Sequence, residues 1–192
     1  KTLSHKKADE ISILNIDREI NSSLISILRA ISTNISCPLS YGGGIKSIED
    51  IKVLSSLSID RFILGSACYG AELNTNIEKI INLVGSAALS ASIDILEDKG
   101  EFYRLDHDIN EFIKVDLLDY LRKLIEVGFA EIIITAINND GLMLGIPNIY
   151  EEILSKINYP RKIVIAGGIG KTEDIKRFLE VDSVVGIMIG SA

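Results

Sequence analysis

Paired glycines at the ends of apolar runs carry the clearest chemical signal in this chain. Gly43 and Gly44 follow one apolar run and precede a helical pattern, and Gly167 and Gly168 repeat that arrangement. Glycines there let backbone N–H groups approach an anion, and a helix N-terminus adds a partial positive charge. Two further pairs end the next apolar runs: Gly65 with Ser66, and Gly190 with Ser191. Each is placed beside one glycine pair, so that the two pairs together could form a phosphate-binding cradle. Repeated cradles favour a substrate with two phosphates over glycines that only permit tight turns.

Single polar side chains also stand at the ends of apolar runs. Asp94 closes one run, where partial burial would tune its carboxyl group as a general acid or base. Asp140 and Gly141 follow another run, with Thr135 shortly before them, although Asp-Gly is also an ordinary turn signal. Asn15 holds the corresponding place early in the chain. These positions predict functional side chains beside the glycine cradles.

Histidines and cysteines predict neither a metal site nor a redox site. His5 and His107 have no partner at ligand spacing, so we expect them on the surface or in loops, with 106–108 a solvated loop. Cys37 and Cys68 imply no disulfide framework and fit a reducing, cytoplasmic compartment with both side chains in core packing. No nucleotide-binding glycine motif occurs, so no cofactor is expected.

Composition narrows the class of protein. Hydrophobic residues make up 47% of the 192 residues and charged residues 24%, which is ordinary for a packed domain and excludes intrinsic disorder. The net charge of −7, without basic blocks, argues against nucleic acid as a partner. No apolar run approaches the roughly 20 residues of a membrane span, and no signal peptide is visible.

The elements that must position these residues alternate along the chain. Ile- and Val-rich runs are mostly continuous, as in strands buried on both faces. Ser47 with Asp50 three residues on predicts one helix start, and Thr172 is expected to cap another. The segment 95–110 is expected to form a hairpin or lid. The predicted strands are 11–16, 36–41, 61–64, 88–94, 131–137, 162–166 and 183–189, and the predicted helices are 21–34, 48–56, 72–84, 115–127, 147–157 and 172–179.

An internal repeat decides between two closures of the predicted parallel sheet. The Gly65 and Gly190 motifs are 125 residues apart, and Glu10 and Glu131 open related runs 121 residues apart. A duplicated half of four strands and four helices predicts an α/β fold of the (β/α)₈ (TIM) barrel type, whereas an open doubly wound sheet has no reason to duplicate. We therefore expect one barrel domain over 1–192, incomplete at both ends, whose first strand would precede Lys1.

Taken together, these motifs resemble the histidine-biosynthesis barrels, and above all the cyclase subunit of imidazole glycerol phosphate synthase. The resemblance covers nearly the whole chain, as strands two to eight of the family's barrel. The matching stretches are 38–45, 63–67, 85–86, 92–94, 131–137, 140–141 and 165–168.

The resemblance implies an ammonia-dependent lyase. The family takes ammonia from a partner glutaminase and converts a bis-phosphate ribulosyl aminoimidazole-carboxamide ribotide to imidazole glycerol phosphate and aminoimidazole-carboxamide ribotide. Asp94 matches one of the family's two catalytic aspartates, and the other belongs to the strand absent from this sequence. The ring that gates ammonia matches Glu10, Arg61 and Glu131. The phosphate sites match Gly43, Gly44, Gly65 and Ser66 on one side, and Asp140, Gly141, Gly167, Gly168, Gly190 and Ser191 on the other.

Departures from the family's pattern leave two alternatives open. Asn15 and Asn138 stand where the family usually has aspartates, Leu142 replaces a threonine, and Gly65 replaces an asparagine. One alternative is a cyclase-like subunit that channels ammonia to a sugar amidotransferase of surface-polysaccharide synthesis, where relaxed catalytic residues would be tolerated. The other is the sister isomerase, which acts one step earlier without ammonia.

Overall fold

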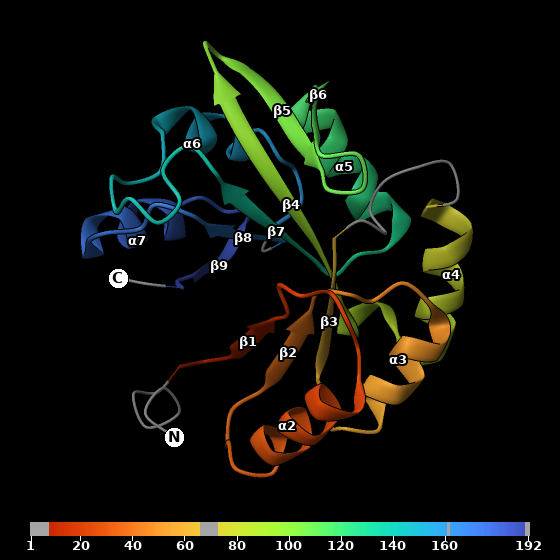
Figure 1. Cartoon of the computed structure of the whole chain (residues 1–192). Helices are drawn as coiled ribbons and strands as arrows, with labels where there is room; N and C mark the ends of the chain where they lie inside the picture. Colours follow the sequence, from red (N-terminus) through yellow and green to blue (C-terminus); the bar gives the residue numbers. More distant parts are fainter. Residues whose placement is uncertain (1–7, 66–72, 161, 191–192) are drawn as a thin grey trace. The chain divides into compact units, whose positions relative to one another are not determined.

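The computed structural model describes residues 8–65, 73–160 and 162–190 (Figure 1). The chain divides into two compact units, residues 1–90 and 91–192, with the boundary near the start of a long strand. Each unit alternates strands with helices. The predicted closure of both into one barrel domain stays a prediction.

The first unit holds three parallel strands. β1 (Ile11–Leu14) pairs with β2 (Leu39–Gly42), and β2 pairs with β3 (Arg61–Leu64), both in parallel. The connections are helical, as parallel neighbours require. They are α2 (Ser22–Ser32), α3 (Ile48–Ser55) and α4 (Leu73–Val84), followed by the short 3₁₀ turn η2 (Ser86–Ala88).

The second unit begins with an antiparallel extension. β4 (Leu89–Asp98) turns back into β5 (Glu101–Asp106), and β5 pairs with β6 (Glu111–Val115), so that these strands project as a long ribbon in Figure 1. The predicted hairpin over 95–110 is thus confirmed, and it is longer than expected because a third strand, β6, pairs with β5.

Parallel strands and helices complete the second unit. α5 (Leu117–Val127), β7 (Glu131–Ala136), α6 (Asn148–Leu154), β8 (Ile163–Ala166), α7 (Thr172–Leu179) and β9 (Val184–Met188) follow in that order. β7 pairs with β8 and β8 with β9, in parallel. α5 starts at Leu117 and not at the predicted residue 115, because β6 extends to Val115. Asp116 is the N-cap of α5, and its side chain accepts a hydrogen bond from the Asp119 N–H.

The two units repeat each other in register. Ile11 lies beside Leu39 in the first unit, and the residues at the corresponding places in the second, Ile132 and Ile163, are also partners. Gly42 pairs with Ile63 as Ala166 pairs with Met188. Because a slip of one residue would turn every side chain to the other face, shared register indicates a duplicated structural unit. The parallel pairing and the repeat confirm the predicted α/β fold of the (β/α)₈ type.

Buried apolar side chains hold each unit together. In the second unit Ile132, Ile134, Ile163, Ile165 and Phe178 are buried, and each such side chain contributes roughly 1.5–3 kcal/mol. The Tyr150 hydroxyl donates a 2.9 Å hydrogen bond to the carbonyl oxygen of Ile95, and its ring meets Phe102 edge to face. These contacts fix α6 and β5 against β4, next to Asp94.

One predicted helix start is wrong by one residue. Thr172 is the first residue of α7 and not its cap; the N-cap is Lys171, which makes no side-chain capping bond. The Asp174 carboxylate accepts a hydrogen bond from the Gly170 N–H instead, so the acidic first turn satisfies the chain before the helix. Among the described residues, no helix is long and apolar enough to cross a bilayer.

Candidate functional site

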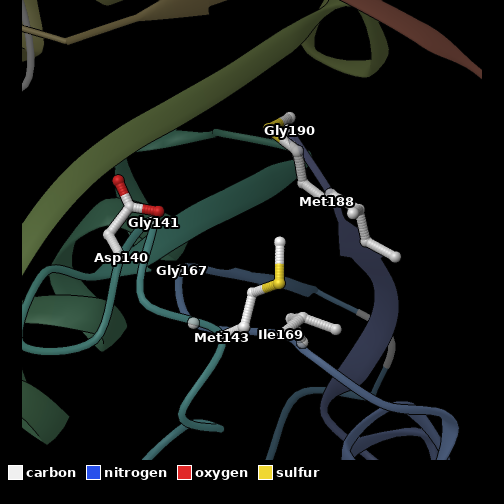
Figure 2. A pocket seen from close by; sticks show the side chains of 9 residues that line it. Asp140, Gly141, Met143, Gly167, Ile169, Met188 and Gly190 are labelled. Atoms are coloured by element: carbon white, nitrogen blue, oxygen red, sulfur yellow. The ribbon is translucent and has the colours of Figure 1, made fainter. Parts of the chain in front are cut away.

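A pocket of about 220 Å³ lies at the carboxyl ends of the strands of the second unit (Figure 2). The loop after β7, the turn after β8 and the end of β9 contribute its walls. Five of the residues predicted to bind phosphate line it, together with four apolar side chains that the sequence did not single out. The lining residues are Asp140, Gly141, Gly167, Gly168 and Gly190, with Met143, Ile169, Met188 and Ile189.

The glycines of this pocket differ in how much space a side chain would find there. A Cβ on Gly167, at φ +89°, would lie 2.6 Å from the Ala136 carbonyl oxygen, and one on Gly168, at φ +76°, would lie 2.7 Å from the Asn139 Cβ. Both therefore need to be glycine for the backbone alone. A Cβ on Gly141 or Gly190 would meet no atom within 4 Å, although Gly141, at φ +72°, still has a backbone angle that favours glycine. Only the latter two face open space, so the pocket, and not the glycine pair, is the evidence for a ligand site.

The first unit repeats this arrangement. A Cβ on Gly43, at φ +95°, would lie 2.2 Å from the Asn15 carbonyl oxygen, and one on Gly44 would lie 2.7 Å from the Arg18 backbone. A Cβ on Gly65 would meet nothing within 4 Å, as at its counterpart Gly190. The same backbone approach and the same open position thus occur twice. Ser66 and Ser191, predicted to complete the two cradles, lie outside the described residues.

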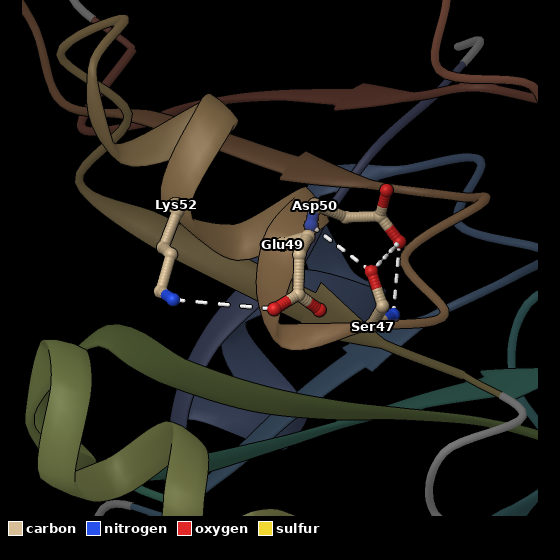
Figure 3. Close-up of polar contacts among 4 residues, drawn as sticks. All are labelled: Ser47, Glu49, Asp50 and Lys52. Carbon is tan, nitrogen blue, oxygen red and sulfur yellow. Dashed lines mark hydrogen bonds and ion pairs between the residues drawn. The ribbon is translucent and has the colours of Figure 1, made fainter.

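The helix that follows the first glycine pair starts at the predicted capping box (Figure 3). The Ser47 hydroxyl oxygen accepts a 3.1 Å hydrogen bond from the Asp50 N–H, and the Asp50 carboxylate accepts the Ser47 N–H at 2.8 Å. That carboxylate also accepts the Lys46 N–H at 2.9 Å, as Asp174 accepts the Gly170 N–H in the second unit. These two N–H groups are therefore used internally and are not available to an anion.

Asp94 has a partner that the sequence did not indicate. It lies half-buried on β4, between the buried Ile93 and Ile95, and its Oδ2 is 2.8 Å from Nε2 of His107. His107 begins the turn between β5 and β6. His107 thus lies in a loop, as expected, but its contact with Asp94 was not predicted. The hairpin turn at Lys99 brings the end of β5 back along β4, but which side chain meets Asp94 depends on the strand register, which has Arg104 opposite Ile95.

The expected solvated loop 106–108 is wrong at its first residue. Asp106 is buried, and its Oδ2 accepts a 3.0 Å hydrogen bond from Arg104 while Oδ1 accepts the Asp108 N–H at 3.1 Å. Burial works to raise the pKa of Asp106, but the bonds from Arg104 and Asp108 outweigh it and hold the pKa below its ordinary value. Asp106 is thus an ionised anchor for the turn that carries His107.

Two further side chains predicted to bind substrate, Asp140 and Thr135, lie after and on β7. Asp140 is exposed in the loop after β7 and borders the pocket. Thr135 is half-buried on β7 in register with Ala166, and it is not among the residues that line the pocket. Its role as a ligand to substrate stays a prediction.

The two asparagines that replace the family's aspartates act as structural donors. Nδ2 of Asn138 donates to the Glu97 carbonyl at 2.7 Å, and its Oδ1 accepts the Glu97 N–H at 2.9 Å. Nδ2 of Asn15 donates to the Glu19 carbonyl at 3.0 Å and to the Tyr41 hydroxyl at 3.2 Å. An ionised carboxylate has no hydrogen to donate. At both positions the amide ties a strand end to a neighbouring backbone; an aspartate could still accept the Glu97 N–H at position 138, but it could not donate to the Glu97 or Glu19 carbonyl oxygens.

Tyr41 extends the hydrogen bonds of Asn15 to the first glycine turn. Its hydroxyl donates to the Gly43 carbonyl at 2.8 Å while accepting from Asn15. Burial raises the pKa of Tyr41, against the smaller opposite effect of the Asn15 bond, so the phenol stays neutral. The neutral pair fixes the first glycine turn.

Two of the three predicted gate residues meet. Nε of Arg61 lies 3.6 Å from Oε1 of Glu10, with 21% and 32% of the two side chains exposed. Arg61 opens β3 and Glu10 directly precedes β1, so the pair lies at the amino ends of these parallel strands. Glu131 opens β7 in the second unit, at the counterpart of Glu10 in the repeat.

Comparison with known proteins gives one consistent result. A family model described as "Histidine biosynthesis protein" matches residues 1–192. A relative from Leptospira borgpetersenii is 29% identical over 201 residues, which cover 100% of this chain and 76% of that protein.

Two further relatives are each named imidazole glycerol phosphate synthase subunit HisF. One, from an Exiguobacterium species, is 28% identical over 178 residues, with 90% of this chain and 68% of the relative covered. The other, from Saccharolobus solfataricus, is 28% identical over 180 residues, with 92% and 69% covered. With the motifs, the repeat and a family match along the whole sequence, this chain belongs to the histidine biosynthesis protein family.

Proposed function

We propose that this chain is the cyclase subunit of an imidazole glycerol phosphate synthase, a lyase of histidine biosynthesis in the cytoplasm. It would combine ammonia with the bis-phosphate ribulosyl aminoimidazole-carboxamide ribotide and release imidazole glycerol phosphate and aminoimidazole-carboxamide ribotide. The family match along the whole chain supports a role in histidine biosynthesis, and the names of the relatives support the cyclase over the isomerase and the sugar-amidotransferase subunit.

The observation that carries the proposal is the pocket of the second unit and the repetition of its backbone in the first. A phosphate group would sit in the pocket beside Gly141 and Gly190, whose Cα atoms face open space. The first unit offers the same open position at Gly65, next to the turn of Gly43 and Gly44. Two cradles of one design suit a substrate with two phosphates, and binding both fixes its orientation.

Asp94 would supply the proton transfers. Addition of ammonia, closure of the imidazole ring and cleavage of the carbon–nitrogen bond each move a proton, and a half-buried carboxylate suits this role. Asp94 lies within β4, which continues past it to Asp98 as part of the antiparallel ribbon. In the proposed reaction Asp94 takes a proton from the attacking nitrogen and returns one to a leaving group. We further propose that Asp140 and Thr135 contact the substrate.

A glutaminase subunit is the proposed partner, and it would deliver ammonia past Glu10, Arg61 and Glu131. Bulk water near neutral pH would protonate most of the ammonia, and the ammonium ion is no nucleophile. Delivery inside the protein preserves the neutral form. The Glu10–Arg61 ion pair is half-buried and therefore able to open and close at a modest cost.

The activity is tested on the full-length protein without a glutaminase. With ammonium at alkaline pH, we expect the protein to convert the ribotide to imidazole glycerol phosphate. The assay measures the loss of substrate and identifies the product by chromatography. Asp94→Asn is expected to lower kcat by about 10²–10⁴-fold, the usual range for a general acid or base. Leu96→Val, two residues along the same strand, serves as the control. No product from folded protein would contradict the proposal and favour the ammonia-channelling subunit, whereas conversion without ammonia would favour the isomerase.

The partner is tested by coupling. With a glutaminase present, Arg61→Ala should lower the ratio of product formed to glutamine hydrolysed, because the gate would leak ammonia. Lys52→Ala, which breaks the exposed Lys52–Glu49 pair on α3, is the matched control. An unchanged ratio in Arg61→Ala would remove the gate from the proposal.

A further inference from the structure

The contact between Asp94 and His107 links the proposed acid–base group to the antiparallel ribbon of the second unit. Nε2 of the histidine lies 2.8 Å from Oδ2 of the aspartate. When the Asp94 carboxylate is ionised it can only accept hydrogen bonds, and the hydrogen of this contact then lies on Nε2. Side-chain exposure is 24% for His107 and 26% for Asp94, which leaves the pair open to a ligand while much of its surface is shielded from water.

The histidine is itself held in place. Asp106, directly before it, is fixed by Arg104 and by the Asp108 N–H. Asp106 also pairs with Glu111 across the turn, so the segment 107–110 is closed by strand pairing at its base. The backbone that carries His107 is therefore held at both ends of the turn.

We propose that His107 is a positioning residue for Asp94. Its Nε2–H occupies Oδ2 and holds the carboxyl plane, so that Oδ1 is the oxygen that exchanges protons with the substrate. This role rests on the proposed function of Asp94. It gives the β4–β5–β6 ribbon a task in the reaction, because movement of the ribbon would release the carboxylate and lower the rate of proton transfer.

The hydrogen bond is tested first, by a measurement that needs no activity. The chain has two histidines, so a long-range ¹H–¹⁵N correlation spectrum contains two imidazole rings, and His5→Gln assigns them. We expect the His107 ring to carry its hydrogen on Nε2 and its Nε2 resonance to move in Asp94→Asn, while the His5 ring is unaffected. A His107 ring that does not respond to Asp94→Asn would overturn the proposal.

The role in turnover is tested with three variants under saturating ammonium. His107→Leu removes the donor, and we expect kcat to fall by about tenfold to a hundredfold with little change in KM, since a displaced group costs rate more than binding. His107→Gln places an amide donor near the former Nε2 and should recover much of the rate. Asp108→Asn changes the charge of the same turn but keeps His107, and should behave as wild type.

The outcomes separate the two proposals. An active wild type with unchanged kcat in His107→Leu overturns the positioning role and leaves the cyclase intact. An inactive wild type overturns the cyclase and the positioning role with it. If His107→Leu does not fold, His107→Gln decides: wild-type rate together with the ring response to Asp94→Asn supports the proposal, and a rate as low as that of Asp94→Asn overturns it.

Discussion

Gly167 and Gly190 are both glycines of the pocket, yet we expect alanine to affect them in opposite ways. In Gly167→Ala the new Cβ would lie 2.6 Å from the Ala136 carbonyl oxygen, and φ is +89°. In Gly190→Ala the Cβ would meet nothing within 4 Å, and φ lies outside the left-handed region. The first change strains the fold, and the second only fills space in the pocket.

The loss of stability at Gly167 follows from three contributions. An L-residue in the left-handed region costs about 1–2 kcal/mol. Relief of an overlap with backbone costs about 1–3 kcal/mol, because the Ala136 carbonyl belongs to a strand end and must move. Alanine also restricts the unfolded chain more than glycine does, which offsets about 0.4–1 kcal/mol of this loss. We therefore expect Gly167→Ala to lower the free energy of unfolding by about 3 kcal/mol, or Tm by roughly 6–12 °C for a chain of this size.

Equilibrium unfolding in urea, in a buffer free of phosphate, is the assay. Gly190→Ala should change the free energy of unfolding by less than about 0.5 kcal/mol, as most open positions do. With phosphate added, it should instead lose the stabilisation that a bound anion gives the wild type. Gly43→Ala tests the repeat, and should resemble Gly167→Ala. Equal losses in Gly167→Ala and Gly190→Ala would refute the reasoning.

Three further changes follow from individual hydrogen bonds. Asn138→Asp removes the donor to the Glu97 carbonyl, so we expect about 1–3 kcal/mol lower stability and no gain in turnover, and higher turnover would contradict this. Asp106→Asn loses the charge bound to Arg104. Because the pKa of Asp106 is lowered in the folded protein, the Asp106 charge stabilises the fold fully above the unfolded pKa of about 4. That stabilisation disappears as pH falls through the folded pKa. Denaturation curves of both proteins should therefore converge at acidic pH. Tyr150→Phe removes one of the two hydrogen bonds to the Ile95 carbonyl, which keeps the Ile137 N–H at 3.1 Å, and should cost about 0.5–1.5 kcal/mol, measured by thermal unfolding; a loss of about 3 kcal/mol or more would contradict this.

Much of the fold is predictable because its signals are local. The apolar runs around Ile134 and Ile165 are continuous, and a strand buried on both faces needs nothing else to be recognised. Ser47 and Asp50 specify a helix start within four residues, and that capping box is present. The boundary at Thr172 was missed because the Asp174 carboxylate, and not a capping hydroxyl, satisfies the N–H before the helix.

In the candidate site, too, the residues with local sequence signals were predicted and the others were not. Asp140, Gly141 and Gly190 were predicted from strand ends, and they meet at one pocket because parallel strands present their carboxyl ends at one edge. The apolar wall of that pocket was not predicted. Met143 and Met188 come from separate loops and strands, and an apolar side chain near a turn has no pattern that distinguishes a pocket wall from core.

What the sequence determined by itself is the alternation of elements, the internal repeat and the family. Each depends on the order of residue types along the chain, which burial and turn formation constrain locally. Tertiary structure alone decided which side chains are partners. His107 reaches Asp94 across 13 residues, and Asn138 reaches Glu97 across 41. A hydrogen bond requires about 3 Å and a defined direction, and only the register of packed strands sets those.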